Sequence, residues 1–132
     1  NAFVAQFIGE NNRLIATVEA IEGEVATVRY PSGATGKALA VNCGGPGSRT
    51  TLSIRPERVR LTAEGPNATE GEVLELIYLG DHIRCRMRVH GDENFIVKVP
   101  NAPGHRQLRV GEVTPVSWEI EDCRALDAPA EG

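Results

Sequence analysis

The chain has 132 residues, of which 41% are hydrophobic and 24% charged, a composition typical of one folded globular domain or two very small ones. Its net charge of −4 argues against general affinity for nucleic acid, which requires a positive surface. No apolar run approaches the length of about 18 residues that a membrane span needs. The composition therefore favours a folded domain without a membrane-spanning segment.

Residues 1–10 open the chain with apolar side chains at Phe3, Val4, Phe7 and Ile8. This spacing predicts a short helix that begins after Asn1 and ends near Gly9. Two turns of helix are marginal alone in water, so we expect this segment to pack on another surface.

Alternating apolar and polar residues predict a series of short strands in the first half of the chain, separated by glycine-rich and proline-rich turns. These strands cover residues 13–21, 24–30, 37–41 and 51–54. Residues 59–61 are expected to continue as extended, strand-like backbone, and residues 62–71 read as a linker-like loop.

The second half continues in the same way, and residues 82–90 give the clearest period-two pattern of the chain. Residues 72–80 fit a helix almost as well as a strand, but glycines at both ends bracket a strand length. A proline places the strand at 113–120 at an edge or a bulge, and residues 121–132 read as a tail. The predicted strands are 72–80, 82–90, 94–99 and 113–120.

Strands spaced by about 8 to 12 residues, with no convincing internal helix, predict an all-β fold of barrel or sandwich type. Residues 16–30 and 71–89 both read as strand, tight turn, strand, which indicates two related small barrel modules. In a chain of this length, we expect their strands to interleave rather than to form independent domains.

Arg84, Arg86 and Arg88 form the strongest electrostatic feature, because alternation places them on one face of the strand at 82–90. Such a face can bind an anion, an acidic partner or RNA. The alternative, favoured because no aromatic residue interleaves with the arginines, is a solvated face balanced by glutamates on neighbouring strands. The glutamates in question are Glu72, Glu75 and Glu93.

Residues 53–59 place Arg55, Pro56 and Glu57 at a corner after a strand. Proline fixes the backbone there and ends the strand ladder. Arg55 and Glu57 are then available for bidentate pairing with a partner, or they form a local ion pair.

The sequence predicts no catalysis, because no serine or cysteine lies in the context of a nucleophile and residues 43–48 lack the frame of a phosphate-binding loop. Three widely spaced cysteines indicate a reducing compartment rather than a disulfide framework. No cofactor or metal site is expected, since Cys85 would point away from His82 and His90 on a strand.

Four blocks of the sequence follow one another in the order FVAQFIGENNRL, LSIRPERVRL, GEVLELIYLGDHIRCRM and VGEVTPVSWEIEDCRAL. Taken together, they resemble the C-terminal regulatory region of ATP-binding subunits of ABC importers of the maltose, polyamine, iron and sulfate type. This region is called a TOBE domain. The resemblance covers nearly the whole chain, and the YLGD block with NFIVKVPN looks most like the polyamine and iron branches.

The resemblance implies OB-like β-barrel modules at residues 11–127, preceded at 1–10 by the last helix or hinge of an ATPase domain that is missing here, and followed by a tail at 128–132. The Walker A, signature and switch-histidine motifs are absent from the sequence. The resemblance thus implies no ATP hydrolysis by this chain, with ATP and magnesium held in the missing domain.

For partners, the resemblance implies the ATPase domain in cis, a second copy of the subunit, and membrane permeases reached through the ATPase. It places the protein in the cytoplasm, peripheral to the inner face of the cell membrane. Carried over by motif, Arg55, Pro56 and Glu57 match the RPE corner of the family, and Gly80 with Asp81 matches its LGD turn. These five residues are the predicted regulatory or subunit contacts.

Two other functions remain open from the sequence. One is a free-standing OB-like module that binds a small anion or an oligonucleotide. The other is a plain structural or oligomerisation domain.

Overall fold

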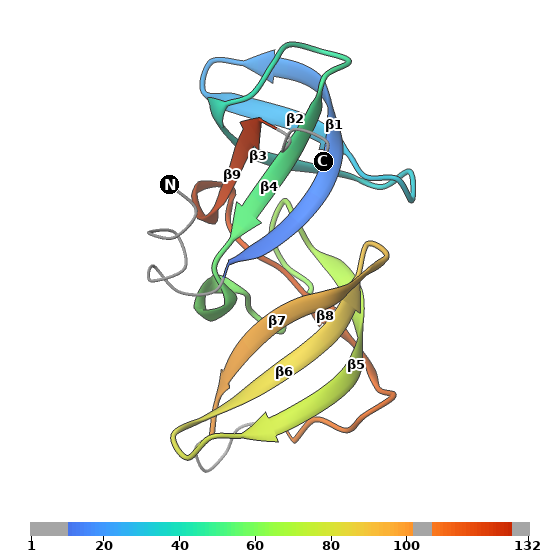
Figure 1. Cartoon of the computed structure of the whole chain (residues 1–132), viewed down its shortest axis with the longest axis vertical. Coiled ribbons are helices and arrows are strands. Elements are labelled where there is room, and N and C mark those ends of the chain that lie inside the picture. Colours follow the sequence, from blue (N-terminus) through green and yellow to red (C-terminus); the bar gives the residue numbers. More distant parts are fainter. Residues whose placement is uncertain (1–10, 102–106, 128–132) are drawn as a thin grey trace.

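The computed structural model describes residues 11–101 and 107–127, which form two β modules (Figure 1). The predicted helix over residues 1–10 and the tail at 128–132 lie outside the described residues. Within the described ranges the only helices are two short 3-10 turns, η2 (Pro56–Arg58) and η3 (Ile120–Asp122). No helix in these ranges has the length and apolar character that would let it cross a membrane.

The first module is a closed barrel of five strands in the order β1-β2-β3-β9-β4. All pairs are antiparallel except β3 with β9, which run parallel. The strands are β1 (Asn12–Glu22), β2 (Val25–Arg29), β3 (Thr35–Asn42), β4 (Arg49–Ile54) and β9 (Cys123–Asp127).

The second module is a four-stranded antiparallel sheet in the order β7-β6-β5-β8. Its strands are β5 (Thr69–Tyr78), β6 (His82–Val89), β7 (Asp92–Pro100) and β8 (Val113–Val116). The all-β prediction is confirmed, and residues 72–80 lie in a strand. The strands at 13–21, 24–30, 37–41, 51–54, 82–90 and 94–99 are confirmed to within about two residues at each end.

The tail prediction for residues 121–132 is wrong for its first part, because residues 123–127 form β9. This strand closes the barrel between β3 and β4, with Cys123 and Ala125 fully buried. The four strands of the sheet are thus inserted in the chain between β4 and β9, although each module keeps its own sheet and the predicted interleaving is limited to the return of β9 to the barrel.

Three other boundaries differ from the sequence prediction. The strand predicted at 113–120 ends at Val116, and Trp118 turns into the core, where its ring lies 5.4 Å from that of Phe95. Residues 59–61 form no strand, since Arg60 makes only an isolated bridge with Ser117. The linker-like loop ends earlier than predicted, because β5 begins at Thr69.

One continuous core of buried side chains runs through both modules. Along β1, Leu14, Ala16 and Val18 are buried between exposed neighbours, as the alternation predicts. The inward side chains of β6 and β7 fill the second module: Cys85, Met87, Val89, Phe95 and Val97. Because the core is continuous, the two modules pack as one body.

Candidate functional site

The corner predicted at residues 55–57 joins β4 to η2. Arg55 is extended, with φ −77° and ψ 137°, and Pro56 opens the 3-10 turn, where its missing N–H costs nothing. The main chain closes the turn as Arg58 N donates to Arg55 O at 3.0 Å. Pro56 is buried, whereas Arg55 and Glu57 are exposed on either side of it. Pro56 therefore shapes the corner, and its two charged neighbours face the solvent.

Arg55 and Glu57 form the local ion pair that the sequence left open as one alternative. Arg55 Nη1 lies 3.8 Å from Glu57 Oε2, and the two side chains are 57% and 48% exposed. A pair this long and this exposed contributes well under about 1 kcal/mol. The guanidinium of Arg55 consequently keeps hydrogen-bond donors available for a ligand or a partner.

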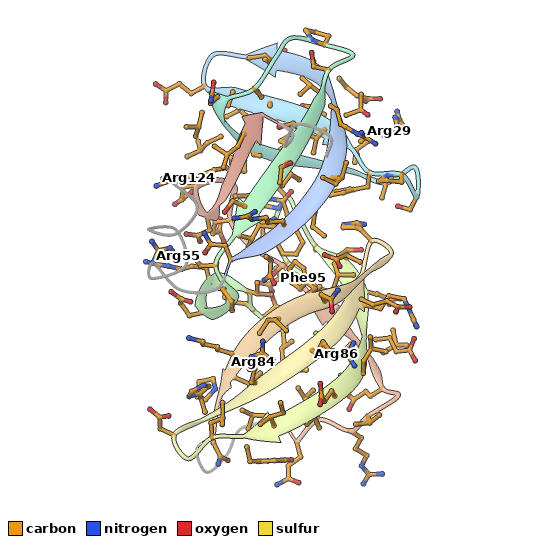
Figure 2. The ribbon with its side chains drawn as sticks, in the orientation of Figure 1. Arg29, Arg55, Arg84, Arg86, Phe95 and Arg124 are labelled. Carbon is orange, nitrogen blue, oxygen red and sulfur yellow. The ribbon has the colours of Figure 1, made fainter. Side chains whose placement is uncertain are left out.

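A groove of about 630 Å³ opens beside this corner, and we call it the corner groove. Three arginines reach it from different elements: Arg55 after β4, Arg58 in η2 and Arg124 in β9. In Figure 2, Arg55 and Arg124 project from the same side of the molecule. The remaining lining residues are Asn11, Val41, Ser53, Glu121, Asp122 and Leu126.

Sequence reasoning missed Arg124, Glu121 and Asp122 because it assigned them to the tail. A signal was nevertheless present, since Cys123 and Ala125 alternate with Arg124 in the period of a strand. Five residues between two turns are too short for this signal to stand out, and only the pairing with β3 and β4 makes them a strand.

The arginines of the corner groove are weakly engaged. Arg58 Nε lies 3.9 Å from Asp122 Oδ1, beyond hydrogen-bond distance. Among the described residues, the side chains of Arg55, Arg58 and Arg124 donate no hydrogen bond. Arginines elsewhere in the chain do bond to carboxylates, for example Arg60 to Glu119. The groove is thus lined by cationic groups with unused donors.

The predicted LGD turn links β5 to β6 at the end of the sheet that lies away from the barrel (Figure 1). Gly80 adopts φ +81°, which glycine tolerates without steric cost. Leu79 N donates to His82 O at 2.9 Å, and Asn101 braces the turn through bonds to the carbonyls of Gly80 and Asp81 at 3.0 and 3.1 Å. The turn therefore has a defined shape.

Asp81 is almost fully exposed, and its Oδ1 lies 2.9 Å from Nδ1 of the neighbouring His82. This hydrogen bond and the adjacent imidazole lower the pKa of the Asp81 carboxyl. Ile77 and Tyr78 at the end of β5, and Leu79 just after it, are exposed apolar side chains. The turn thus presents a carboxylate near exposed apolar side chains. It lies at a distance in the fold from the corner groove, so the structure does not bring the two predicted contact regions together.

The arginine stripe on β6 is balanced by glutamates of the neighbouring strands, as one alternative predicted. Arg86 Nε donates to Glu75 at 3.1 Å. Arg88 bonds to Glu72, and its Nη2 lies 3.1 Å from Glu93 Oε2. Arg84 stands opposite Ile77 and Lys98 in the sheet. With Arg86 and Arg88 occupied, the stripe is a surface of paired charges.

Two of the three cysteines, Cys85 and Cys123, are buried, and Cys43 is partly exposed. Burial raises the pKa of Cys85 to about 11 and that of Cys123 to about 12, so both remain protonated near neutral pH. Across residues 11–101 and 107–127, no group of three or more histidine, cysteine or carboxylate side chains is arranged to hold a metal ion.

Curated relatives that this chain resembles carry the name spermidine/putrescine import ATP-binding protein PotA. The protein from Rubrobacter xylanophilus is 36% identical over 128 residues, which span 96% of this chain. That from Ruegeria pomeroyi is 35% identical over 125 residues, or 94% of this chain. In both cases the chain spans about a third, 34%, of the length of the relative.

Among solved structures, the fold is similar to that of a cytoplasmic molybdate-binding protein, ModG, with a TM-score of 0.76. The match covers 89% of this chain and 96% of the other, at 14% sequence identity. This likeness supports the OB-like architecture. The sequence profile of the TOBE domain matches residues 52–126, from the end of β4 to β9 and more than half of the chain. The chain belongs to the TOBE domain family.

Proposed function

We propose that this chain is the regulatory and assembly domain of the ATP-binding subunit of an ABC importer, with polyamines as the class of transported solute. The observation that carries the proposal is the 36% identity to a spermidine/putrescine import ATP-binding protein over 96% of this chain. The similarity includes β1 to β3, which lie before the residues that match the TOBE profile at 52–126.

In this proposal the chain performs no hydrolysis. ATP and magnesium bind in the ATPase domain of the parent protein, and this chain regulates that domain through contacts with it. The buried, protonated thiols and the paired charges of β6 agree with a domain that acts by binding. The net charge of −4 agrees with a domain that does not bind nucleic acid.

Regulation requires that the domain make different contacts in different states of the ATPase. The two modules share one core, so we expect a contact made on one module to affect the other. We assign Arg55 and Glu57 at the corner, and Gly80 with Asp81 at the LGD turn, to contacts with the ATPase domain in cis or with a second copy of the subunit. Pro56 is buried and supports the corner from within.

The parent subunit would form a homodimer at the cytoplasmic face of the cell membrane, and its ATPase domains would engage the membrane permeases. The exposed side chains of Ile77, Tyr78 and Leu79 near Asp81 offer apolar area for such a subunit contact.

The corner is tested by Arg55→Ala combined with Glu57→Ala in the full-length parent protein. We expect a changed ATPase rate in the presence of permeases, a changed dimer fraction in solution, or both. The matched control is Arg29→Ala with Glu19→Ala, which removes an exposed ion pair from another part of the barrel (Figure 2 labels Arg29). If the corner variant behaves like this control in both assays, the corner has no regulatory role.

The assignment to an importer is tested separately. The 132-residue chain should show no ATP hydrolysis, whereas the parent protein should bind and hydrolyse ATP. ATP hydrolysis by the chain alone would contradict the proposal that another part of the parent protein carries the ATPase activity.

A further inference from the structure

We propose that the corner groove binds a small organic polyanion, with phosphate or carboxylate groups that accept hydrogen bonds from Arg55, Arg58 and Arg124. This inference goes beyond the proposed function, because binding can be measured on the 132-residue chain whether or not the parent protein is an importer. Phosphate and carboxylate share the chemistry that arginine recognises, namely paired oxygens that match its planar fork of N–H donors.

The first argument is the unused hydrogen-bonding capacity of the three arginines. Each guanidinium carries five N–H donors. Within residues 11–101 and 107–127, the nearest carboxylates to Arg55 and Arg58 lie at 3.8 and 3.9 Å, and Arg124 has no ion-pair partner. Arg88, by contrast, bonds to two glutamates. Three guanidinium groups with unused N–H donors line one groove, and together they can bind an anion that has several oxygen atoms.

The second argument is the rigidity of the elements that carry the arginines. Arg124 lies in β9, which is hydrogen-bonded on both sides and anchored by the buried side chains of Cys123 and Ala125. Arg55 directly follows β4, and the buried Pro56 holds the corner. The main chain that carries these two arginines is therefore already ordered, and the entropy lost on binding a ligand is mainly that of the arginine side chains.

The third argument concerns the size and apolar wall of the groove. A volume of about 630 Å³ falls within the range typical of sites for small molecules. Val41, which is 54% exposed, and Leu126 line it beside the arginines, and Ser53 adds a hydroxyl. A carbon skeleton can contact these apolar side chains, which favours an organic anion over a bare inorganic ion.

Glu121 and Asp122 also line the groove, and their negative charges make it possible to test whether the ligand is an anion or a cation. The carboxylate of Asp122 lies 3.9 Å from Arg58 Nε, beyond hydrogen-bond distance. Among the described residues Glu121 forms no ion pair with a cationic side chain, and its charge would repel an anion. Removal of its charge should therefore strengthen the binding of an anion and weaken the binding of an amine.

The experiment is isothermal titration of the 132-residue chain with citrate, for the carboxylate arm, and glucose 1,6-bisphosphate, for the phosphate arm. We expect saturable binding of at least one probe, weakened about tenfold or more in Arg124→Gln, as loss of a charged hydrogen bond predicts. Arg55→Gln should weaken it similarly, and Glu121→Gln should strengthen it. Arg29→Gln, outside the groove, serves as the matched control, and circular dichroism confirms that every variant folds.

Several outcomes would overturn the inference. They are the absence of saturable binding of both probes up to millimolar concentrations, equal weakening by Arg29→Gln and Arg124→Gln, and weaker binding by Glu121→Gln. None of these results bears on whether the chain belongs to an importer, which the ATPase assays on the chain and on the parent protein decide. Saturable binding that Arg124→Gln leaves intact would place the anion elsewhere and would likewise reject the corner groove.

Discussion

The side-chain amide of Asn12 bonds to both main-chain groups of Ile96. Its Nδ2 donates to Ile96 O at 2.8 Å, and its Oδ1 accepts from Ile96 N at 2.7 Å. Ile96 lies in β7, an edge strand of the sheet, and Asn12 is the first residue of β1 in the barrel. One amide thus takes the place of a neighbouring strand at this edge and links the two modules.

Replacement of Asn12 by alanine should destabilise the chain by about 2 to 4 kcal/mol, because it leaves a buried N–H and a buried C=O without partners. Urea unfolding followed by the fluorescence of Trp118, the single tryptophan, measures the change. The control is Asn11→Ala at the exposed neighbouring position. Equal midpoints for the two variants would show that the amide link carries no stability.

The imidazole of His90 stacks on the ring of Tyr30, with centroids 3.7 Å apart and an interplanar angle of 9°. Tyr30 follows β2 in the barrel, and His90 follows β6 in the sheet, so the stack is a second link between the modules. Burial lowers the pKa of His90 from 6.5 to about 4. The histidine therefore remains neutral in the folded chain at pH values where it is protonated in the unfolded chain.

This shift predicts a loss of stability on acidification. As the pH falls from 6.5 towards 4, the unfolded chain takes up a proton at His90 that the folded chain does not, so the free energy of unfolding decreases. His90→Asn tolerates the positive φ of 50° and lacks this titration. The stability advantage of the wild type over the variant should shrink across this pH window in urea unfolding. A constant difference would contradict the prediction.

Asn67 is the buried residue of the loop before β5, and it ties this loop to the barrel. Its Oδ1 accepts from Lys37 N at 2.8 Å, and its Nδ2 donates to the carbonyls of Lys37 and Trp118 at 3.0 and 3.3 Å. A Cβ at Gly36 would lie 2.8 Å from Asn67 Oδ1 and 3.1 Å from the Tyr30 hydroxyl. The glycine therefore makes room for this amide.

Gly36→Ala should accordingly cost about 1 to 3 kcal/mol, as for other substitutions that overfill a packed site. Gly45→Ala is the matched control, since a Cβ there meets nothing within 4 Å. Thermal unfolding of the two variants measures the difference. A melting temperature for Gly36→Ala as high as that of the control would show that the loop moves aside without cost.

The parallel pairing of β3 with β9 predicts that the barrel depends on the last strand. A chain that ends at Asp122 exposes the facing edges of β3 and β4 and the core beneath Cys123 and Ala125. We expect loss of amide-exchange protection in β3 and β4. A chain that ends at Asp127 keeps β9 and serves as control. Native protection in the shorter chain would mean that four strands suffice.

Removal of Arg88 should have a small effect, although this residue pairs with both Glu72 and Glu93. The side chains are between 38% and 59% exposed, so Arg88→Ala should cost about 1 kcal/mol or less. Unfolding at low and high salt checks the cause, since screening should reduce the difference. A larger cost that salt does not change would indicate that packing of the arginine stem dominates.

The local patterns were sufficient to predict most strands, the inward face of β6 and its charge balance. Alternation along β6 places Cys85 and Met87 inside and Arg86 outside, because successive side chains of a strand point to opposite faces. The same reasoning failed at β9, since five residues carry little periodic signal. It also located Arg55 at a corner but found none of the residues that face it across the groove.

The sequence by itself determined an all-β chain, the turn at Gly80, the proline corner and the blocks that mark a TOBE domain, because these depend on local backbone preferences and on residue order. The tertiary structure alone decided that residues 123–127 close the barrel and that Asn12 completes the edge of β7. It also brought Arg124 to the same groove as Arg55, although the two residues are far apart in the sequence. Contacts at such separations follow from strand pairing and shared burial, which neighbouring residues in a sequence do not encode.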